Sequence, residues 1–130
     1  MADHESIDNA TIANSYRELT GTVPANIAER IRIAGISGRN RSIIRIEELR
    51  SQLIMDNPLG PKTAQLVHFA QLLAIGEEKE AELHADAARK AGASLEELVG
   101  VVELALITAG MPAYSRGVAI LGRVFPENQT

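Results

Sequence analysis

The stretch Asn57-Pro58-Leu59-Gly60-Pro61 limits the possible folds of this chain more than any other. Neither a helix nor a central strand continues through it, because proline lacks the backbone N–H that both structures use. Weaker breakers divide the remainder at residues 20–24, 37–38, 76, 92 and 110–112. The segments between them carry apolar residues at helical spacing, and none alternates like a strand. The sequence therefore predicts an all-α fold of six to seven helices.

The ends of the expected helices follow from proline, glycine and capping signals. Pro61 suits the first position of a helix, and Gly76 suits the position just after one. Ser94, followed by Glu97 three residues later, forms a capping box. The predicted helices cover residues from 6 or 8 to about 19, 24–36, 40–55, 61–75, 76–92, 94–110 and 111–124. The helix over 61–75 is apolar nearly all round, so we expect it to be buried on most sides.

Composition and charge exclude several classes of protein. The 130 residues have the length of a single domain. A net charge of −4 argues against a nucleic-acid surface, which needs clustered Lys and Arg. The start of the chain lacks the apolar region of a signal peptide, and no apolar run reaches the ~18 residues of a membrane span. We therefore expect a cytoplasmic protein.

The sequence contains no cysteine. This absence excludes disulfides, thiolate nucleophiles and thiol redox chemistry, so the chain is not a thiol peroxidase.

Three ionisable side chains near residue 80 fall on the apolar side of their predicted helix. With Glu80 placed at 0° and 100° added per residue, His84 lies at about 40° and Glu77 at about 60°. The alanines of the same helix point in similar directions, whereas most of its other charged residues lie opposite. A carboxylate beside an imidazole raises the His pKa and selects its tautomer, which suits general acid–base catalysis. Glu80 and His84 are therefore candidate catalytic residues, or alternatively a structural ion pair.

Other polar side chains are candidates for the same site. Gln65 and His68 are neighbours on one face of the helix over 61–75, and each is either a pocket residue or a satisfied core residue. Thr108 and Tyr114 flank the break at 110–112, where side chains can point into a cavity or a subunit contact. An alternative is a metal site, because carboxylates and imidazoles are common metal ligands. Its ligands would be Glu77, Glu80, His84 and His68.

Three spaced blocks in the second half of the chain resemble the carboxymuconolactone decarboxylase family of the alkylhydroperoxidase-like superfamily. The first block is Gly76-x-Glu78-x-Glu80-x-x-x-His84. The others are Ala91-Gly92-Ala93-Ser94-x-Glu96-Glu97-Leu98 and Thr108-Ala109-Gly110-Met111-Pro112-Ala113-Tyr114-Ser115. The likeness covers roughly residues 60–122, and the three blocks agree in order. It implies an all-α subunit that assembles into a ring-like homo-oligomer, a trimer or a hexamer, with a pocket near a subunit interface.

The resemblance also bears on the site. In the peroxidase branch a Glu, a Cys-x-x-Cys pair and a His form a proton relay, and the matching positions here are Gln65, Glu77, Glu80 and His84. In the decarboxylase branch a Glu stands four residues before the His, as Glu80 and His84 do. Glu77 stands where the decarboxylases commonly have Arg, and Tyr114-Ser115 replaces their usual Ala-Asn.

Two hypotheses follow. The first is a cofactor-free lyase or isomerase acting on a small acidic, lactone or carbonyl substrate. In it His84 exchanges the proton, Glu80 orients His84, and Gln65, His68, Glu77, Thr108 and Tyr114 contact the substrate; no metal is expected. The second is a non-catalytic helical oligomer that binds a small molecule or a partner protein. Both require self-association, because the helices over 61–75 and 94–110 carry more apolar surface than a small monomer needs to bury.

Overall fold

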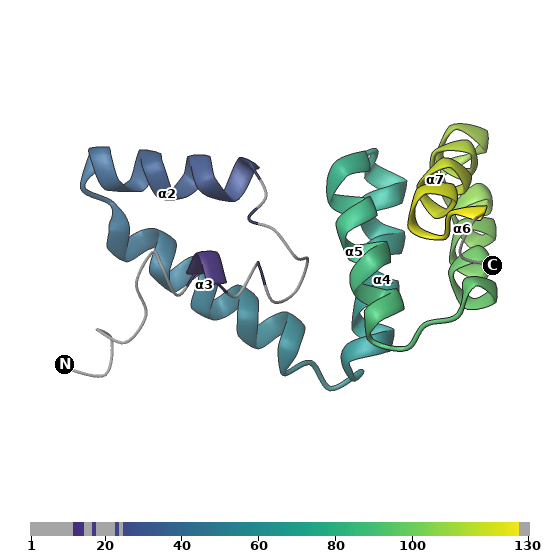
Figure 1. Cartoon of the computed structure of the whole chain (residues 1–130), viewed down its shortest axis with the longest axis horizontal. Coiled ribbons are helices and arrows are strands. Elements are labelled where there is room, and N and C mark those ends of the chain that lie inside the picture. The colour runs from purple at the N-terminus through teal and green to yellow at the C-terminus, as the bar shows by residue number, and fades with distance from the viewer. Residues whose placement is uncertain (1–11, 15–16, 18–22, 24, 128–130) are drawn as a thin grey trace. The chain divides into compact units, whose positions relative to one another are not determined.

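The computed structural model describes residues 12–14, 17, 23 and 25–127. Within these residues the regular structure is helical and contains no strand, as predicted (Figure 1). The chain divides into two compact units, residues 1–55 and 56–130, and each is considered by itself. The prediction of a single domain remains a prediction. No helix in the described part of the chain is long and apolar enough to cross a membrane.

The first unit contains a pair of helices, α2 (Ala25–Ser37) and α3 (Asn40–Met55). Gly38, with a φ of 75°, makes the turn between them. The pair buries a small aliphatic cluster of Ile12, Ile27, Ala34 and Ile43. The helix predicted to run to about residue 19 lies largely outside the described residues, although residues 12–14 and 17 are helical.

The second unit is built from two helical hairpins. The first joins α4 (Pro61–Ile75) to α5 (Glu78–Lys90), and the second joins α6 (Leu95–Ala109) to α7 (Met111–Val124). Short connections at residues 76–77 and 110 make the helices of each hairpin antiparallel neighbours (Figure 1). Across the two hairpins, α4 contacts α6 and α5 contacts α7.

The predicted end signals act as expected in this unit. Gly76 adopts the left-handed conformation, with a φ of 86°, and its N–H bonds to the carbonyl of Leu73. The next N–H, of Glu77, donates to the carbonyl of Leu72 at 3.0 Å, which completes a Schellman end. The capping box is also present: Glu97 N donates to Ser94 Oγ at 3.0 Å, and Ser94 N donates to Glu97 Oε1 at 2.9 Å.

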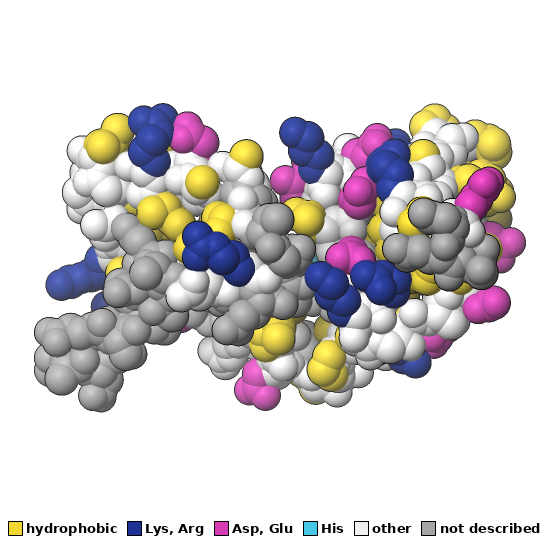
Figure 2. All heavy atoms as spheres, viewed as in Figure 1, with side chains coloured by type: hydrophobic (Ala, Val, Ile, Leu, Met, Phe, Trp, Pro, Cys, Tyr) yellow, Lys and Arg dark blue, Asp and Glu magenta, His cyan; other side chains and the backbone are white. Residues whose placement is uncertain are grey.

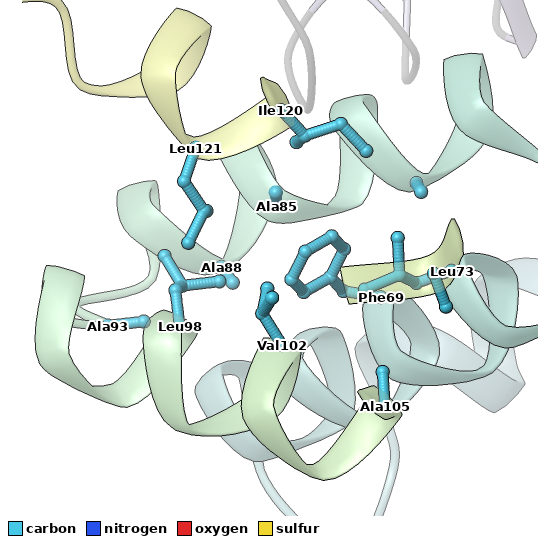
Figure 3. Close-up of a cluster of buried hydrophobic side chains, with 12 residues drawn as sticks. Phe69, Leu73, Ala85, Ala88, Ala93, Leu98, Val102, Ala105, Ile120 and Leu121 are labelled. Carbon is cyan, nitrogen blue, oxygen red and sulfur yellow. The ribbon is translucent and has the colours of Figure 1, made fainter. Parts of the chain in front are cut away.

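The core of the second unit joins large side chains of α4, α6 and α7 to alanines of α5 (Figure 3). Phe69, Leu73, Leu98 and Ile120 are each 0% exposed. Alanine on the inner face of α5 lets this helix lie close to its neighbours, because there is no long side chain to hold them apart. This close approach brings the polar side chains of α4 and α5 within hydrogen-bonding distance.

Most of the predicted helix bounds are confirmed. The predicted ranges 40–55 and 61–75 coincide with α3 and α4. α5 is shorter than expected, because the left-handed turn at Gly76 delays its start to Glu78. The helix over 61–75 is buried or half-buried on most sides, as predicted, but one stripe that includes Val67, at 40% exposure, stays open.

Candidate functional site

The candidate site is centred on His84, which lies on the inner face of α5. The periodicity of the sequence predicts this direction, and only 4% of the His84 surface is exposed. Ala81, Ala85 and Ala88, on the same face, are each 0% exposed. A buried imidazole needs a hydrogen-bonding partner, because an unsatisfied polar group away from water costs about 1–3 kcal/mol.

Gln65 of α4 supplies a partner. Its Oε1 lies 2.7 Å from Nδ1 of His84, and Gln65 is itself 4% exposed. An amide oxygen only accepts hydrogen bonds, so Nδ1 carries the hydrogen and donates it. In the neutral ring the lone pair is then on Nε2, which makes that nitrogen the basic atom.

His68, three residues after Gln65 and on the same side of α4, contacts the imidazole of His84 directly. The two ring centroids are 4.1 Å apart, and the ring planes meet at 72°, which is an edge-to-face arrangement. His68 is half-buried. The ring of His84 is therefore in contact with two side chains from one face of α4.

The two glutamates predicted to accompany His84 differ in their positions. Glu80 is half-buried, one turn before His84 on α5. Glu77 is exposed and precedes the helix, with a φ of −87° and a ψ of 78°. The expectation that Glu77 faces the apolar side with the other two is wrong, because helical periodicity does not extend into the turn that Gly76 makes.

Tyr114 lies in the first turn of α7 and is half-buried against the core of the second unit. This turn is near the α4–α5 connection, since a Cβ built on Gly76 would be 3.8 Å from a terminal guanidinium nitrogen of Arg116. The role of Tyr114 as a substrate contact stays a prediction.

Thr108 is exposed and lines a groove between α4 and α6 with a volume of about 350 Å³. Nine residues line this groove, seven of them apolar, and Gln65, His68 and His84 are not among them. The largest exposed side chain in the lining is Leu104, at 69% exposure. Hydrophobic side chains also reach the surface over α6 and α7 (Figure 2). We call this the α4–α6 groove.

The alternative metal site is not assembled. Among the residues that the structure describes, no three or more His, Asp or Glu side chains come close enough together to hold a metal ion. Glu77, Glu80, His68 and His84 all belong to this described part. The basic and acidic side chains near α5 form ion pairs instead: Arg123 of α7 binds Glu82 at 2.7 Å and Glu78 at 3.1 Å.

Comparison with known families agrees with this helical arrangement. The sequence model of the carboxymuconolactone decarboxylase family matches residues 44–122, which is more than half of the chain. The chain belongs to the carboxymuconolactone decarboxylase family. As a member without any cysteine, it lacks the thiols of the peroxidase branch. No significant match was found among curated proteins or among solved structures.

Sequence reasoning located His84 and its neighbours Gln65 and His68, but it did not predict the hydrogen bond between His84 and Gln65. The periodicity of one helix suggested Glu80 as the partner, since i,i+4 pairs are neighbours on a helix. The short α4–α5 connection predicts antiparallel neighbours and places residue 84 near residue 69, so the contact with residue 65 depends on how the packed helices are offset. For the α4–α6 groove, the sequence gives only one indication, which is the excess of apolar residues in both helices.

Proposed function

We propose that this member of the carboxymuconolactone decarboxylase family is a cofactor-free acid–base enzyme, a lyase or an isomerase. Its substrate is a small acidic compound that contains a lactone or another carbonyl group. The observation that supports this proposal is the imidazole of His84, which is almost fully buried and is hydrogen-bonded through Nδ1 to Gln65. A ring held in this way has one defined nitrogen for proton exchange, and burial limits competition from bulk water.

Two reactions suit such a group. In decarboxylation the bond to the carboxylate carbon breaks, CO₂ leaves, and the electron pair is delocalised into the neighbouring carbonyl. His84, protonated on both nitrogens, then gives a proton to the carbon. In isomerisation, neutral His84 removes a proton from a carbon next to the carbonyl and returns it to another carbon. Both reactions use the same nitrogen and need no added cofactor.

The remaining predicted residues have supporting roles in this proposal. Glu80, one turn before His84, favours the protonated ring during the reaction. Gln65 and His68 surround the imidazole. Glu77, Thr108 and Tyr114 remain predictions as substrate contacts; Glu77 precedes α5, and Thr108 lines the α4–α6 groove.

The test uses the purified full chain with carboxymuconolactone and with related carboxylated lactones. CO₂ release and deuterium uptake from solvent into the substrate, followed by NMR, detect the two reactions separately. His84→Gln should lower either rate by at least about 100-fold, because a general acid–base group contributes roughly 10²–10⁴. Gln52→Leu, a substitution at an exposed position of α3, serves as the control. Unchanged rates in His84→Gln would exclude the catalytic role.

The second candidate function is a non-catalytic oligomer, and the α4–α6 groove favours it. The side chains that line the groove include none with a charge. A chain with a net charge of −4 can bind a second copy through such a face without placing like charges against one another. Ala70, Ala74 and Ala105 form the depression of the groove, and exposed Leu104 forms a ridge in the same lining. One face therefore offers both parts of a contact with a second copy. We propose that this face is a contact between copies of the chain.

The two candidates differ in what His84 does. In the non-catalytic oligomer the buried imidazole only stabilises the subunit, so His84→Ala should lower the melting temperature and dissociate the assembly. In the enzyme, His84→Gln should remove turnover while sedimentation still reports the assembly of the unchanged protein. A protein that sediments only as a monomer near 14.0 kDa at micromolar concentration would contradict self-association in either case.

A further inference from the structure

We infer that Gln65 is the positioning residue of the proposed site, and that it holds His84 in the tautomer whose Nε2 takes up and returns the proton. This inference rests on the proposed function of His84 and adds to it the order of the proton transfers. It adds a residue of α4 to the prediction that Glu80 orients the imidazole from α5.

The contact itself carries the argument. The distance of 2.7 Å between Nδ1 and Oε1 is that of a strong hydrogen bond. Both side chains are 4% exposed, so little water is available to take the place of either partner. If the hydrogen moved to Nε2, Nδ1 and Oε1 would be two acceptors facing each other inside the protein, and this arrangement is costly. With the Gln65 amide oriented as in the structure, the tautomer with hydrogen on Nδ1 is therefore favoured.

Gln65 differs from a carboxylate because it selects the tautomer without adding a negative charge. A carboxylate in its place would stabilise the imidazolium. The contact of His68 acts in the same direction, since two imidazoles at 4.1 Å do not both become charged easily. Gln65 and His68 thus favour a neutral His84 at the start of the reaction.

A neutral imidazole with its lone pair on Nε2 begins a reaction as a base. In a carbonyl substrate with a carbon–carbon double bond at the β,γ position, it breaks the C–H bond between that double bond and the carbonyl. The electron pair moves to the carbonyl oxygen as a dienolate, and the proton goes to Nε2. The imidazolium then returns this proton to a different carbon, and the double bond has moved. Among the two reactions proposed above, the geometry favours this proton shift, because decarboxylation requires a protonated ring at the moment when CO₂ leaves.

Other ionisable groups lie on α5 and on the helices that contact it, and their charges act on the imidazole of His84. Glu80 lies on α5 itself, one turn away, and is the carboxylate that would favour the charged ring. Several of the others form ion pairs: Lys62 of α4 with Glu97, Arg123 of α7 with Glu78 and Glu82, and Asp86 of α5 with Arg89 and Lys90. Lys79 of α5 is exposed, and Arg116 of α7 donates to the carbonyl of Pro112.

The tautomer can be measured without any substrate. The chain contains only three histidines, so ¹⁵N NMR of the labelled full-length protein resolves each imidazole. We expect His84 to show a protonated Nδ1 and an unprotonated Nε2 near neutral pH. Gln65→Leu should shift a large part of the signal to the other tautomer, whereas Gln52→Leu, the same substitution at an exposed position of α3, should leave it unchanged. Hydrogen on Nε2 in the unchanged protein, or no response to Gln65→Leu, would overturn the inference.

Gln65→Glu supplies a second variant that retains the acceptor and adds a charge. The added charge should move the NMR titration midpoint of His84 to higher pH. The ascending limb of the pH–rate profile should move by the same amount, a response expected only if His84 is the base. Gln65→Leu should lower turnover by about 100-fold, the cost of a misplaced catalytic group. The NMR result is independent of turnover. Hydrogen on Nε2 of His84 in the unchanged protein would overturn this inference, whereas full activity in His84→Gln would overturn the proposed function.

Discussion

The two sides of α4 reverse the usual relation between polarity and burial. Towards α5, Gln65 is 4% exposed and bonds to a histidine, whereas towards α6, Val67 is 40% exposed in an apolar groove. Proteins ordinarily bury the aliphatic side chain and expose the amide. One side of the helix therefore has the composition of a site for chemistry, and the other has that of a surface that contacts another molecule.

The largest expected effect concerns the groove side. Leu104→Glu places a charge on the apolar face, and this charge would be buried without a partner when two copies associate. We expect the dissociation constant for self-association to rise by about 100-fold, equivalent to ~2.7 kcal/mol. Analytical ultracentrifugation over a range of concentrations measures it. Val118→Glu, which changes an exposed valine of α7 outside the groove, is the control. Equal association of the two variants would mean that the groove is not the contact.

The next effect concerns the polar side. Gln65→Leu leaves the Nδ1–H of buried His84 without its acceptor, which should lower the free energy of unfolding by about 1–3 kcal/mol. Gln52→Leu, the same substitution at an exposed position of α3, should change it by less than about 0.5 kcal/mol. Urea denaturation of both variants measures the difference. If the two substitutions cost the same, the hydrogen bond contributes nothing measurable to stability.

A third prediction concerns the tight packing behind the groove. A Cβ on Gly117 of α7 would lie 2.7 and 2.8 Å from the methyl carbons of Val102, and 3.0 Å from Leu73 Cδ2. The overlap costs about 1–3 kcal/mol and exceeds the gain in helix propensity of up to about 1 kcal/mol, so Gly117→Ala should destabilise the protein. Gly122→Ala, in the same helix with nothing within 4 Å, should instead stabilise it. Opposite shifts in melting temperature are expected, and shifts of the same sign would contradict the close approach.

The smallest effect is at one end of the groove, where Lys62 of α4 meets Glu97 of α6 at 3.1 Å. The N–H of Ser94, and then Lys62, hold the pKa of the Glu97 carboxyl below 4.5. Because its pKa is lowered, the Glu97 carboxylate stabilises the folded protein at pH values above 4.5. This stabilisation disappears as the pH falls from 4.5 through the lowered pKa. Glu97→Gln should therefore be slightly less stable than the unchanged protein at about pH 7 and nearly equal to it at about pH 3, measured by urea denaturation. A difference that stays constant with pH would exclude this ionisation as its cause.

The sequence predicts the helices well and the site in part. The bounds of α3 and α4 agree with the predicted ranges, because prolines and glycines act on the backbone at their own positions. The inward direction of His84 also follows from the sequence, since it depends on the period of one helix. Glu77 shows the limit of that period, because the residue lies in a turn before the helix begins.

The partner of His84 and the open side of α4 could not be predicted in the same way. Nineteen residues separate Gln65 from His84, and their contact depends on how α4 and α5 align when they pack. Apolar residues surround α4, but only the placement of α6 shows which of them stay uncovered within the chain.

By itself, the sequence determined the helical class, the ends of most helices, the absence of thiol chemistry and the burial of the histidine. Each of these depends on composition or on backbone geometry within a few residues. Only the tertiary structure decided that an amide holds the imidazole through Nδ1, and that an apolar groove lies on the other side of the same helix. Both depend on the register and spacing between helices, which are set by side-chain packing across the core.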